Sequence, residues 1–540
     1  MGIGPRRIFL VFAENANFVL VLNWTLHDAP YETFSKFYYL GMLVAGLLLV
    51  YFVRTHLKAS LVIFTLVYLL SLILLRFGPT PQPGVYLAAI FFKNIGYFGS
   101  ILIILSALVS AKLPLNSFLI AIFTIWIFKT VGEVSAGIYS FEHSELENLN
   151  FSIHSNENEG GIEPSPQELI FYNLFCILPA VLAVFAATLL KSKMFFGQAS
   201  LKAETKTPLT LKAHPSAWLW QDLVSSYRFW GLVLITFFIE FAQNSNLFLG
   251  TSYIEEIVNE FGLGVYKCII YAPPLVAGLI TLCFLKGRIR ASLIGFSILF
   301  LVSLSLMRFG FITNPVSFAV TDVIRDVGYY GIILTILSAL VTAKLPIKSF
   351  LIAFFIIWFW SYIGDISGFA YENIELRYSP IDDKKTPPIS YVFFQFIVPV
   401  LPAGFAILAA IRLKSAMFLE PPNIDVEAKV ATFRQPFGVF VSVLFVPFYV
   451  LYWLFRQPSE LKTIVPEMHQ PSPRGALCIG LFAPLILPIW FYDVRKELGA
   501  ELNGRSAKWI AVAGFFMPAL AAAMAQSDYN SVVNSRKLEK

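Results

Sequence analysis

The stretch GYFGSILIILSALVSAKLPLNSFLIAIF (Gly96–Phe123) returns later in the chain, almost unchanged, as GYYGIILTILSALVTAKLPIKSFLIAFF (Gly328–Phe355). So close a match over such a length indicates an internal duplication, which must be recognised before any local pattern is interpreted. Each residue of one copy therefore has a counterpart in the other. Shorter matches extend the duplication in both directions: FAENANF (12–18) matches FAQNSNL (241–247), LVAGLLLVYFVRTHLKASLVIF (43–64) matches LVAGLITLCFLKGRIRASLIGF (275–296), and KSKMFF (191–196) matches KSAMFL (414–419).

The composition excludes a water-soluble globular protein. Of the 540 residues, 57% are hydrophobic and only 14% are charged, with a mean hydropathy of +0.70, whereas a soluble domain carries about 25% charged residues. The net charge of +6 does not indicate a nucleic-acid partner, because the basic residues form short clusters between apolar runs. We expect an integral, multi-pass protein whose first partner is the lipid bilayer.

Apolar runs of about 20 residues, the length that a helix needs to cross a bilayer, occur six times in each copy. An even number of spans gives both copies the same orientation, as in parallel repeats. The predicted fold class is therefore all-α and polytopic: two parallel six-helix bundles (twelve spans) plus about three C-terminal membrane helices. The runs lie at 7–24, 38–53, 59–76, 85–111, 116–139 and 168–190, then at 229–249, 267–285, 291–309, 316–343, 348–370 and 391–413, and finally at 436–456, 474–492 and 508–525.

The distribution of basic residues predicts the orientation in the membrane. The segment 141–167 contains no Lys or Arg, as expected of an external loop, while basic clusters between other spans indicate the cytoplasmic side. Both ends of the twelve-span body are then inside, and 371–390 is outside. The predicted domains are an N-terminal bundle (1–190), a cytoplasmic linker (191–228), a C-terminal bundle (229–413), a second linker (414–435) and a C-terminal membrane segment (436–540), called the appendage below.

Motifs in the fourth span of each copy resemble the major facilitator superfamily, and in particular the fourth-span signature of its proton-coupled drug exporters. That signature has a basic residue, two spaced glycines, an apolar run and a proline turn. The loops VRTHLKAS and LKGRIRAS depart from the family pattern because they lack its Asp, and the fifth-span glycine signature is reduced to Gly132 and Gly137. The signature positions are Arg325, Gly328, Gly331 and Pro346 in the second copy, and Lys93, Gly96, Gly99 and Pro114 in the first.

The appendage contains a smaller internal match, YWLFRQPSEL (452–461) with IWFYDVRKEL (489–498). It resembles a small multi-span bacterial domain of unknown function, and that resemblance implies no activity. A protein partner that binds through the appendage is one open alternative.

Charged residues at corresponding positions of both copies point to interhelical ion pairs. Lys93 corresponds to Arg325, and Glu133 corresponds to Asp365. Each position keeps the sign of its charge in both copies although the residue type changes, as an ion pair between spans four and five requires. Each pair is either a structural clamp or part of a gate linked to protons.

Charged residues present in only one copy are the candidates for function, since ionisable groups inside a membrane are costly. Residues three or four apart share a helix face, and this spacing groups the candidates on spans one, seven and ten. In the resembled family, spans one, four, seven and ten line the central cavity; a water-filled crevice without specific chemistry is the alternative. The predicted substrate- and proton-binding residues are Glu14, Asn17, Glu240, Gln243, Asn244, Asp322 and Asp326.

The function that these features imply is secondary active transport, coupled to protons, of a small organic solute by alternating access; the resemblance implies efflux as one direction. The alternative is a non-transporting membrane scaffold or sensor that retains the fold. The chain shows no Gly-rich phosphate loop, nucleophile elbow or HExxH motif, so an enzyme is not expected, and neither a cofactor nor a metal is predicted. The expected location is a bacterial cytoplasmic (inner) membrane.

Glu14 is the predicted carrier of the coupling proton. Its neighbours have close counterparts in the second copy, where Gln243 replaces it. Glu and Gln are similar in size, so the fold alone gives little reason to prefer the acid.

Overall fold

The computed structural model describes residues 31–52, 57–77, 83–111, 113–142, 166–189, 220–246, 257, 272–283, 288–309, 314–343, 345–378, 397–413, 434–445, 449–464, 470–498 and 506–538. The predicted first span and the segments 143–165 and 191–219 lie outside these residues. Within them the regular structure is entirely helical, in agreement with the all-α prediction.

The chain folds into two compact units. The first unit comprises 1–212, 232–347 and 357–415, and the second comprises 213–231, 348–356 and 416–540. Helices α11 and α15 each run from the second unit into the first. The bounds in the first copy are α3 Tyr31–Phe52, α4 Leu57–Phe77, α5 Pro83–Ser110, α6 Leu115–Glu142 and α8 Pro166–Leu189; those from the linker to the end of the second copy are α10 Trp220–Ser225, α11 Tyr227–Asn244, α13 Ile289–Arg308, α14 Pro315–Thr342, α15 Ile347–Tyr378 and α17 Leu401–Arg412.

Five of the described helices are long and apolar enough to cross a membrane, or six if a bent pair in the appendage counts as one span. The five are Leu57–Phe77, Leu87–Ser110, Ile289–Arg308, Pro315–Thr342 and Ile347–Tyr371. Large apolar side chains on their outer surfaces are exposed, for example Leu70 at 62% on α4. These helices support a multi-pass membrane protein, and the full count of twelve plus three spans stays a prediction.

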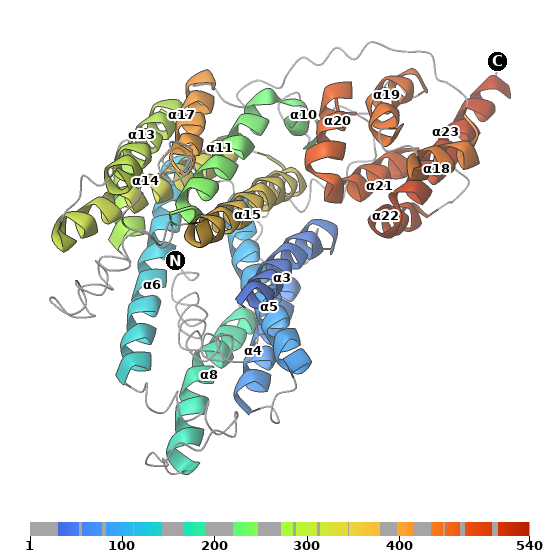
Figure 1. Ribbon diagram of the computed structural model, residues 1–540. Helices are drawn as coiled ribbons and strands as arrows, with labels where there is room; N and C mark the ends of the chain where they lie inside the picture. The colour runs from blue at the N-terminus through green and yellow to red at the C-terminus, as the bar shows by residue number, and fades with distance from the viewer. Residues whose placement is uncertain are drawn as a thin grey trace. The chain divides into compact units, whose positions relative to one another are not determined.

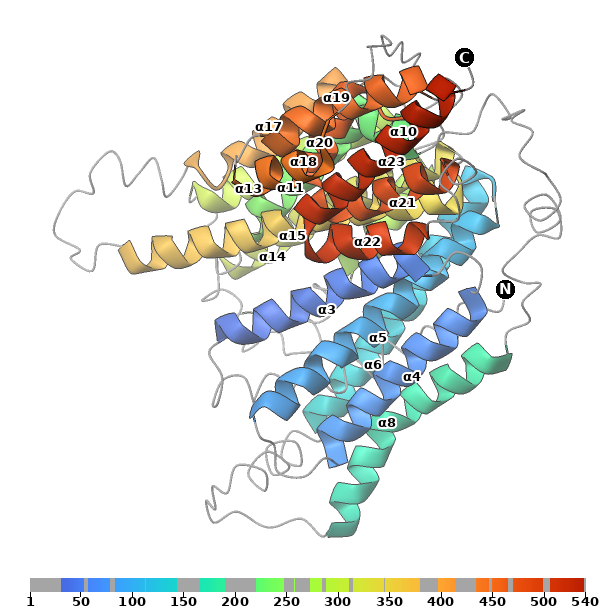
Figure 2. The same cartoon turned by 90° about the vertical axis from the view of Figure 1, so that its right-hand side faces the viewer.

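Within the first unit, corresponding helices pack against each other in the two copies: α4 against α5 in the first copy, and α13 against α14 in the second. Helix α5 lies between α3 and α4, and α8 covers the other side of α4 (Figures 1 and 2). In the second copy α13 packs against both α14 and α17 (Figure 1). The core of the first copy is built from α4, α5 and α8, and includes Tyr68, Leu72, Ile90 and Ile177.

The duplication is visible in the close approach of these helices. A Cβ on Gly96 would lie 2.5 Å from the backbone N of Tyr68, and a Cβ on Gly328 would lie 2.8 Å from that of Phe300. Only glycine allows backbones to meet so closely. The second glycine of each signature does the same against a ring: Gly99 against Phe64 at 2.3 Å, and Gly331 against Phe296 at 2.2 Å.

Helices of the two copies also meet within the first unit. Phe118 and Ile122 of α6 form a buried cluster with Leu334 of α14. Further along the same helices, the rings of Trp126 and Tyr330 meet edge-on with centroids 5.7 Å apart. The α6–α14 contact therefore joins the two copies through large apolar side chains.

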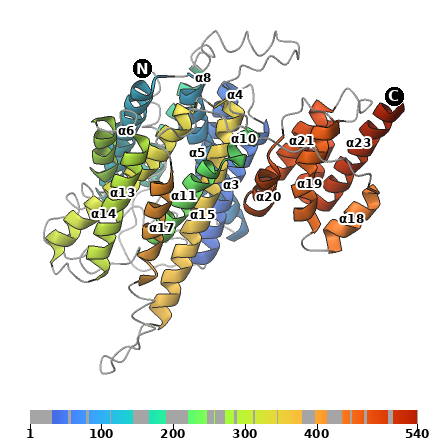
Figure 3. The ribbon, with the colours of Figure 1, turned by 90° about the horizontal axis from the view of Figure 1, so that it is seen from above.

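The second unit contains the appendage, whose helices appear in orange to red (Figure 3). The predicted run 474–492 is two helices that meet at a bend of 111°, and 508–525 is also split, so the expectation of one helix for each of these runs is wrong. Proline lacks an N–H donor and clashes with the preceding turn, so helices break before Pro484 and Pro518. The bounds are α18 Pro436–Phe445, α19 Tyr449–Ile464, α20 Pro473–Phe482, η3 Pro484–Ile486, α21 Leu487–Glu497, α22 Ala507–Phe516 and α23 Pro518–Leu538.

Candidate functional site

Three helices of the first unit meet around the carboxylate of Glu240. Glu240 lies on α11 and is only 9% exposed. Its Oε1 accepts a hydrogen bond from the Tyr329 hydroxyl of α14 and another from the Ser361 hydroxyl of α15, both at 2.8 Å. Two donors from two other helices fix the carboxylate at the point where α11, α14 and α15 converge.

Glycines of α15 make this convergence possible. A Cβ on Gly364 would lie 2.4 Å from the carbonyl oxygen of Phe237 and 3.1 Å from Cβ of Glu240. One turn later, a Cβ on Gly368 would lie 2.5 Å from the carbonyl oxygen of Phe241. Small residues four apart thus let the two backbones touch, and this contact brings Ser361 within reach of Glu240.

A second group of charges lies one turn before Tyr329 on α14. Arg325 is 9% exposed, and its Nη2 lies 2.7 Å from Oδ1 of Asp322 and 2.9 Å from Oδ1 of Asp326. The Gln243 amide of α11 donates to the same Asp326 oxygen at 3.3 Å. Gln243 Oε1 is buried and has no hydrogen-bond partner among the described residues.

The structure brings together five of the residues singled out from the sequence: Glu240, Gln243, Asp322, Arg325 and Asp326. Asn244 instead donates to the backbone carbonyl of Glu240 at 3.1 Å, so its side chain serves its own helix. Asp365 lies close enough to Glu240 for the two charges to interact. Acidic groups outnumber the single base Arg325 in this cluster, which we call the Glu240 site (Glu240, Gln243, Asp322, Arg325, Asp326, Tyr329 and Ser361).

The predicted ion pairs are only partly described. Among the described residues, the ion-pair partners of Arg325 lie on its own helix, and Asp365 is not one of them. Lys93 is buried on α5, at 2% exposure, while Glu133 lies on α6 with its side chain outside the described part. The structure therefore pairs Arg325 with Asp322 and Asp326 of its own helix instead of with Asp365. The Lys93–Glu133 pair stays a prediction, as do the roles of Glu14 and Asn17, which lie outside the described residues.

Two residues of the site were missed from the sequence. Tyr329 lies seven residues after Asp322 and therefore on the same helix face, but it is uncharged. Ser361 could have been found from the sequence, because its counterpart in the first copy is the charged residue Lys129 and the two copies therefore differ in charge at this position.

The first copy has a buried amide where the second has a carboxylate. Asn94 of α5 corresponds to Asp326 and is 0% exposed, beside Gly41 of α3, whose added Cβ would lie 2.9 Å from that of Asn94. Neither amide atom of Asn94 has a hydrogen-bond partner among the described residues. At the position of Gln243 the first copy carries Glu14. The first copy thus has the carboxylate of Glu14 and the amide of Asn94, where the second copy has the amide of Gln243 and the carboxylate of Asp326.

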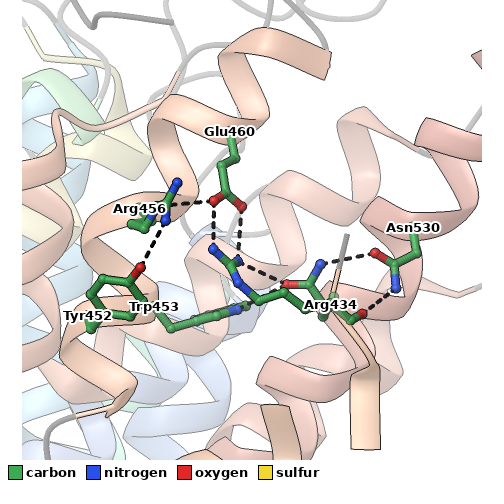
Figure 4. Close-up of polar contacts among 7 residues, drawn as sticks. Arg434, Tyr452, Trp453, Arg456, Glu460 and Asn530 are labelled. Atoms are coloured by element: carbon green, nitrogen blue, oxygen red, sulfur yellow. Dashed lines mark hydrogen bonds and ion pairs between the residues drawn. The ribbon is translucent and has the colours of Figure 1, made fainter. Parts of the chain in front are cut away.

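The second unit holds a separate polar cluster, formed by Arg434, Trp453, Glu460, Gln526 and Asn530. Figure 4 shows the cluster and labels each of these residues except Gln526. Arg434 donates to both oxygens of Glu460, at 2.7 and 3.0 Å, and its carbonyl accepts from Asn530 at 2.6 Å. Trp453 donates to Gln526 at 3.2 Å. A bidentate pair of this kind is geometrically specific, and it ties the segment before α18 to α19 and α23.

No protein-family model and no curated protein matches the chain. Among solved structures, the chain is similar to a single-substitution variant of the fucose:proton symporter FucP of E. coli, with 14% identity over 76% of this chain and 98% of that chain and a TM-score of 0.47. It is also similar to a bacterial homologue of the iron transporter ferroportin in an outward-facing state, with 14% identity over 76% and 97% and a TM-score of 0.48. Likeness at this level does not transfer a substrate or a coupling ion to this chain.

Proposed function

We propose that this protein is a secondary active transporter of the major facilitator type, coupled to protons, which moves a small organic solute by alternating access of its two copies. The observation that carries the proposal is the buried carboxylate of Glu240, held by hydroxyls from two other helices. Ionisable groups in membrane-spanning helices are costly and mark ion or substrate pathways. A scaffold would have no need of this buried acid, which the first copy replaces with Val11.

The arrangement supports proton exchange at Glu240. Both hydroxyl donors act on Oε1, and the Arg325 guanidinium is engaged by Asp322 and Asp326. Among the described residues no cation forms an ion pair with Glu240, and burial of an unpaired charge is unfavourable. Taking up a proton therefore neutralises Glu240 when the site is closed to water. Opening the site to water on one side would favour its release there.

The excess of acidic groups over Arg325 favours a neutral or cationic solute over an anion. The resemblance of the fourth-span signatures to drug exporters favours efflux from the cytoplasm.

Glu14 extends the proposal to the first copy. Gln243 donates to Asp326 at 3.3 Å, and the corresponding residues are Glu14 and Asn94. Each copy thus keeps one carboxylate at this pair of positions, and in the first copy that carboxylate is Glu14. We assign it a share of proton coupling with Glu240.

The test begins with a ligand. A library of small organic solutes is screened for thermal stabilisation of the purified protein, and hits are assayed for movement driven by a pH gradient in proteoliposomes. Glu240→Gln should keep exchange of solute for solute and lose accumulation driven by the gradient, while Glu497→Gln, an exposed acid of the appendage, should behave like the parent. A protein that binds no solute would support the scaffold alternative, and a Glu240→Gln variant that still uses the gradient would remove Glu240 from the mechanism.

A further inference from the structure

One carboxylate of the appendage contacts two distant segments of the chain. Asp493 of α21 forms an ion pair with Lys348, in the first turn of α15. Oδ2 of Asp493 also accepts a hydrogen bond from the indole N–H of Trp220 on α10, at 3.0 Å. Trp220 is 2% exposed, and all three residues belong to the second unit.

Helix α20 makes further contacts with the same part of the linker. The backbone N–H of Ser472 donates to the Ser225 hydroxyl at 2.9 Å. A Cβ on Gly475 would lie 2.5 Å from that hydroxyl oxygen, so α20 and α10 touch without room for a side chain. The rings of Phe482 and Trp230 lie 5.6 Å apart, which places the end of α20 against the start of α11.

The two helices held in this way are those that carry Glu240 and its donor Ser361. Glu240 follows Trp230 by ten residues on α11, about 15 Å along the helix, and Ser361 follows Lys348 by thirteen residues on α15, about 20 Å. The Gly364 contact then joins α11 and α15 beside Glu240. At the position of Lys348 the first copy carries Asn116, so this ion pair is specific to the copy that contains Glu240.

We propose that the appendage is an intramolecular brace that positions the Glu240 site by gripping α11 and α15 at their starts. Lys348 and Asp493 are positioning residues in this scheme, since they act on Glu240 only through the helices. A change in the appendage would then alter how firmly Ser361 is held against Glu240. This role adds a conformational device to the transport function proposed above and does not depend on which solute is moved.

The test measures amide hydrogen exchange by mass spectrometry on the full chain in detergent micelles, without any solute. Lys348→Asn copies the first copy, and Asp493→Asn removes the charge while leaving an acceptor for Trp220. Both variants should exchange roughly five- to thirtyfold faster than the parent around Glu240 and Ser361, as expected for the loss of one or two stabilising contacts. The control is Lys496→Asn, which removes an exposed lysine from the same helix as Asp493 and should leave exchange unchanged.

Lys348→Arg keeps a cation opposite Asp493 and leaves the acceptor of Trp220 in place, so it should retain the parent's protection at both sites. This variant keeps the test informative if Lys348→Asn or Asp493→Asn folds poorly. The proposal is overturned if faster exchange is confined to residues 348–356 and 487–498, because the contact would then be local. It is equally overturned if Lys348→Arg exchanges as fast as Lys348→Asn, or if Lys496→Asn has the same effect. Because no solute is needed, the result is separable from any failure of the transport proposal.

Discussion

Replacing Arg325 with Gln tests whether its guanidinium stabilises the protein by pairing with Asp322 and Asp326. Arg325 lies 2.7 Å from Asp322 and 2.9 Å from Asp326, with side-chain exposures of 11%, 24% and 18%. Loss of the guanidinium leaves two largely buried carboxylates without their cation, and breaking a buried pair in this way costs about 3–5 kcal/mol. The Arg325→Gln variant should therefore be clearly less stable than the parent.

A double-mutant cycle then identifies the partner. Hydrogen bonds to charged groups contribute about 1.5–3 kcal/mol, so Arg325→Gln with Asp326→Asn should show a coupling energy of about 2 kcal/mol. Arg325→Gln with Asp365→Asn should be additive within about 0.5 kcal/mol, because the structure places the partners of Arg325 on α14. Reversible unfolding in mixed SDS micelles, followed by tryptophan fluorescence, gives the four free energies of each cycle.

The opposite pattern would refute this pairing. Strong coupling of Arg325 to Asp365, with additivity between Arg325 and Asp326, would restore the interhelical pair that the sequence predicts. Additivity in both cycles would show that neither carboxylate stabilises Arg325.

Three further outcomes are expected. Glu14→Gln should lose accumulation driven by a pH gradient while retaining exchange, and adding Asn94→Asp, which copies the arrangement of the second copy, should restore part of it; no rescue in proteoliposomes would show that the two positions are not equivalent. Gly364→Val should lower the unfolding free energy by about 1–3 kcal/mol through overpacking against α11, and a variant as stable as the parent in the same SDS assay would contradict the close contact. A cysteine at Ser155 should react with an impermeant maleimide in intact cells and one at Ser200 should not, and the reverse labelling would overturn the predicted orientation.

The duplication made much of the Glu240 site predictable. Comparing copies separated the charges found in one copy from those found in both, and helical spacing placed Asp322, Arg325 and Asp326 on one face. The glycines of the fourth-span signature were also recognised, and the contacts of Gly96 and Gly328 explain why both copies keep them.

The residues that could not be predicted depend on how neighbouring helices are rotated and on where helices break. Ser361 reaches Glu240 only because the Gly364 contact sets the approach of α15 to α11, and no pattern within one helix encodes that. The breaks before Pro484 and Pro518 did have a signal: a phenylalanine, one further residue and a proline occur at both, as LFAP (481–484) and FFMP (515–518). Hydropathy averaged over a run hides such breaks, since a single proline barely changes the mean.

The proposed function links movement of a solute to movement of protons through buried carboxylates. Proteoliposomes loaded with a pH-sensitive dye and given a solute selected by thermal stabilisation test this claim most directly. The protein should change the internal pH when the solute is added, and the change should be absent in liposomes carrying Glu240→Gln. Solute movement with no accompanying pH change in the parent protein would contradict proton coupling.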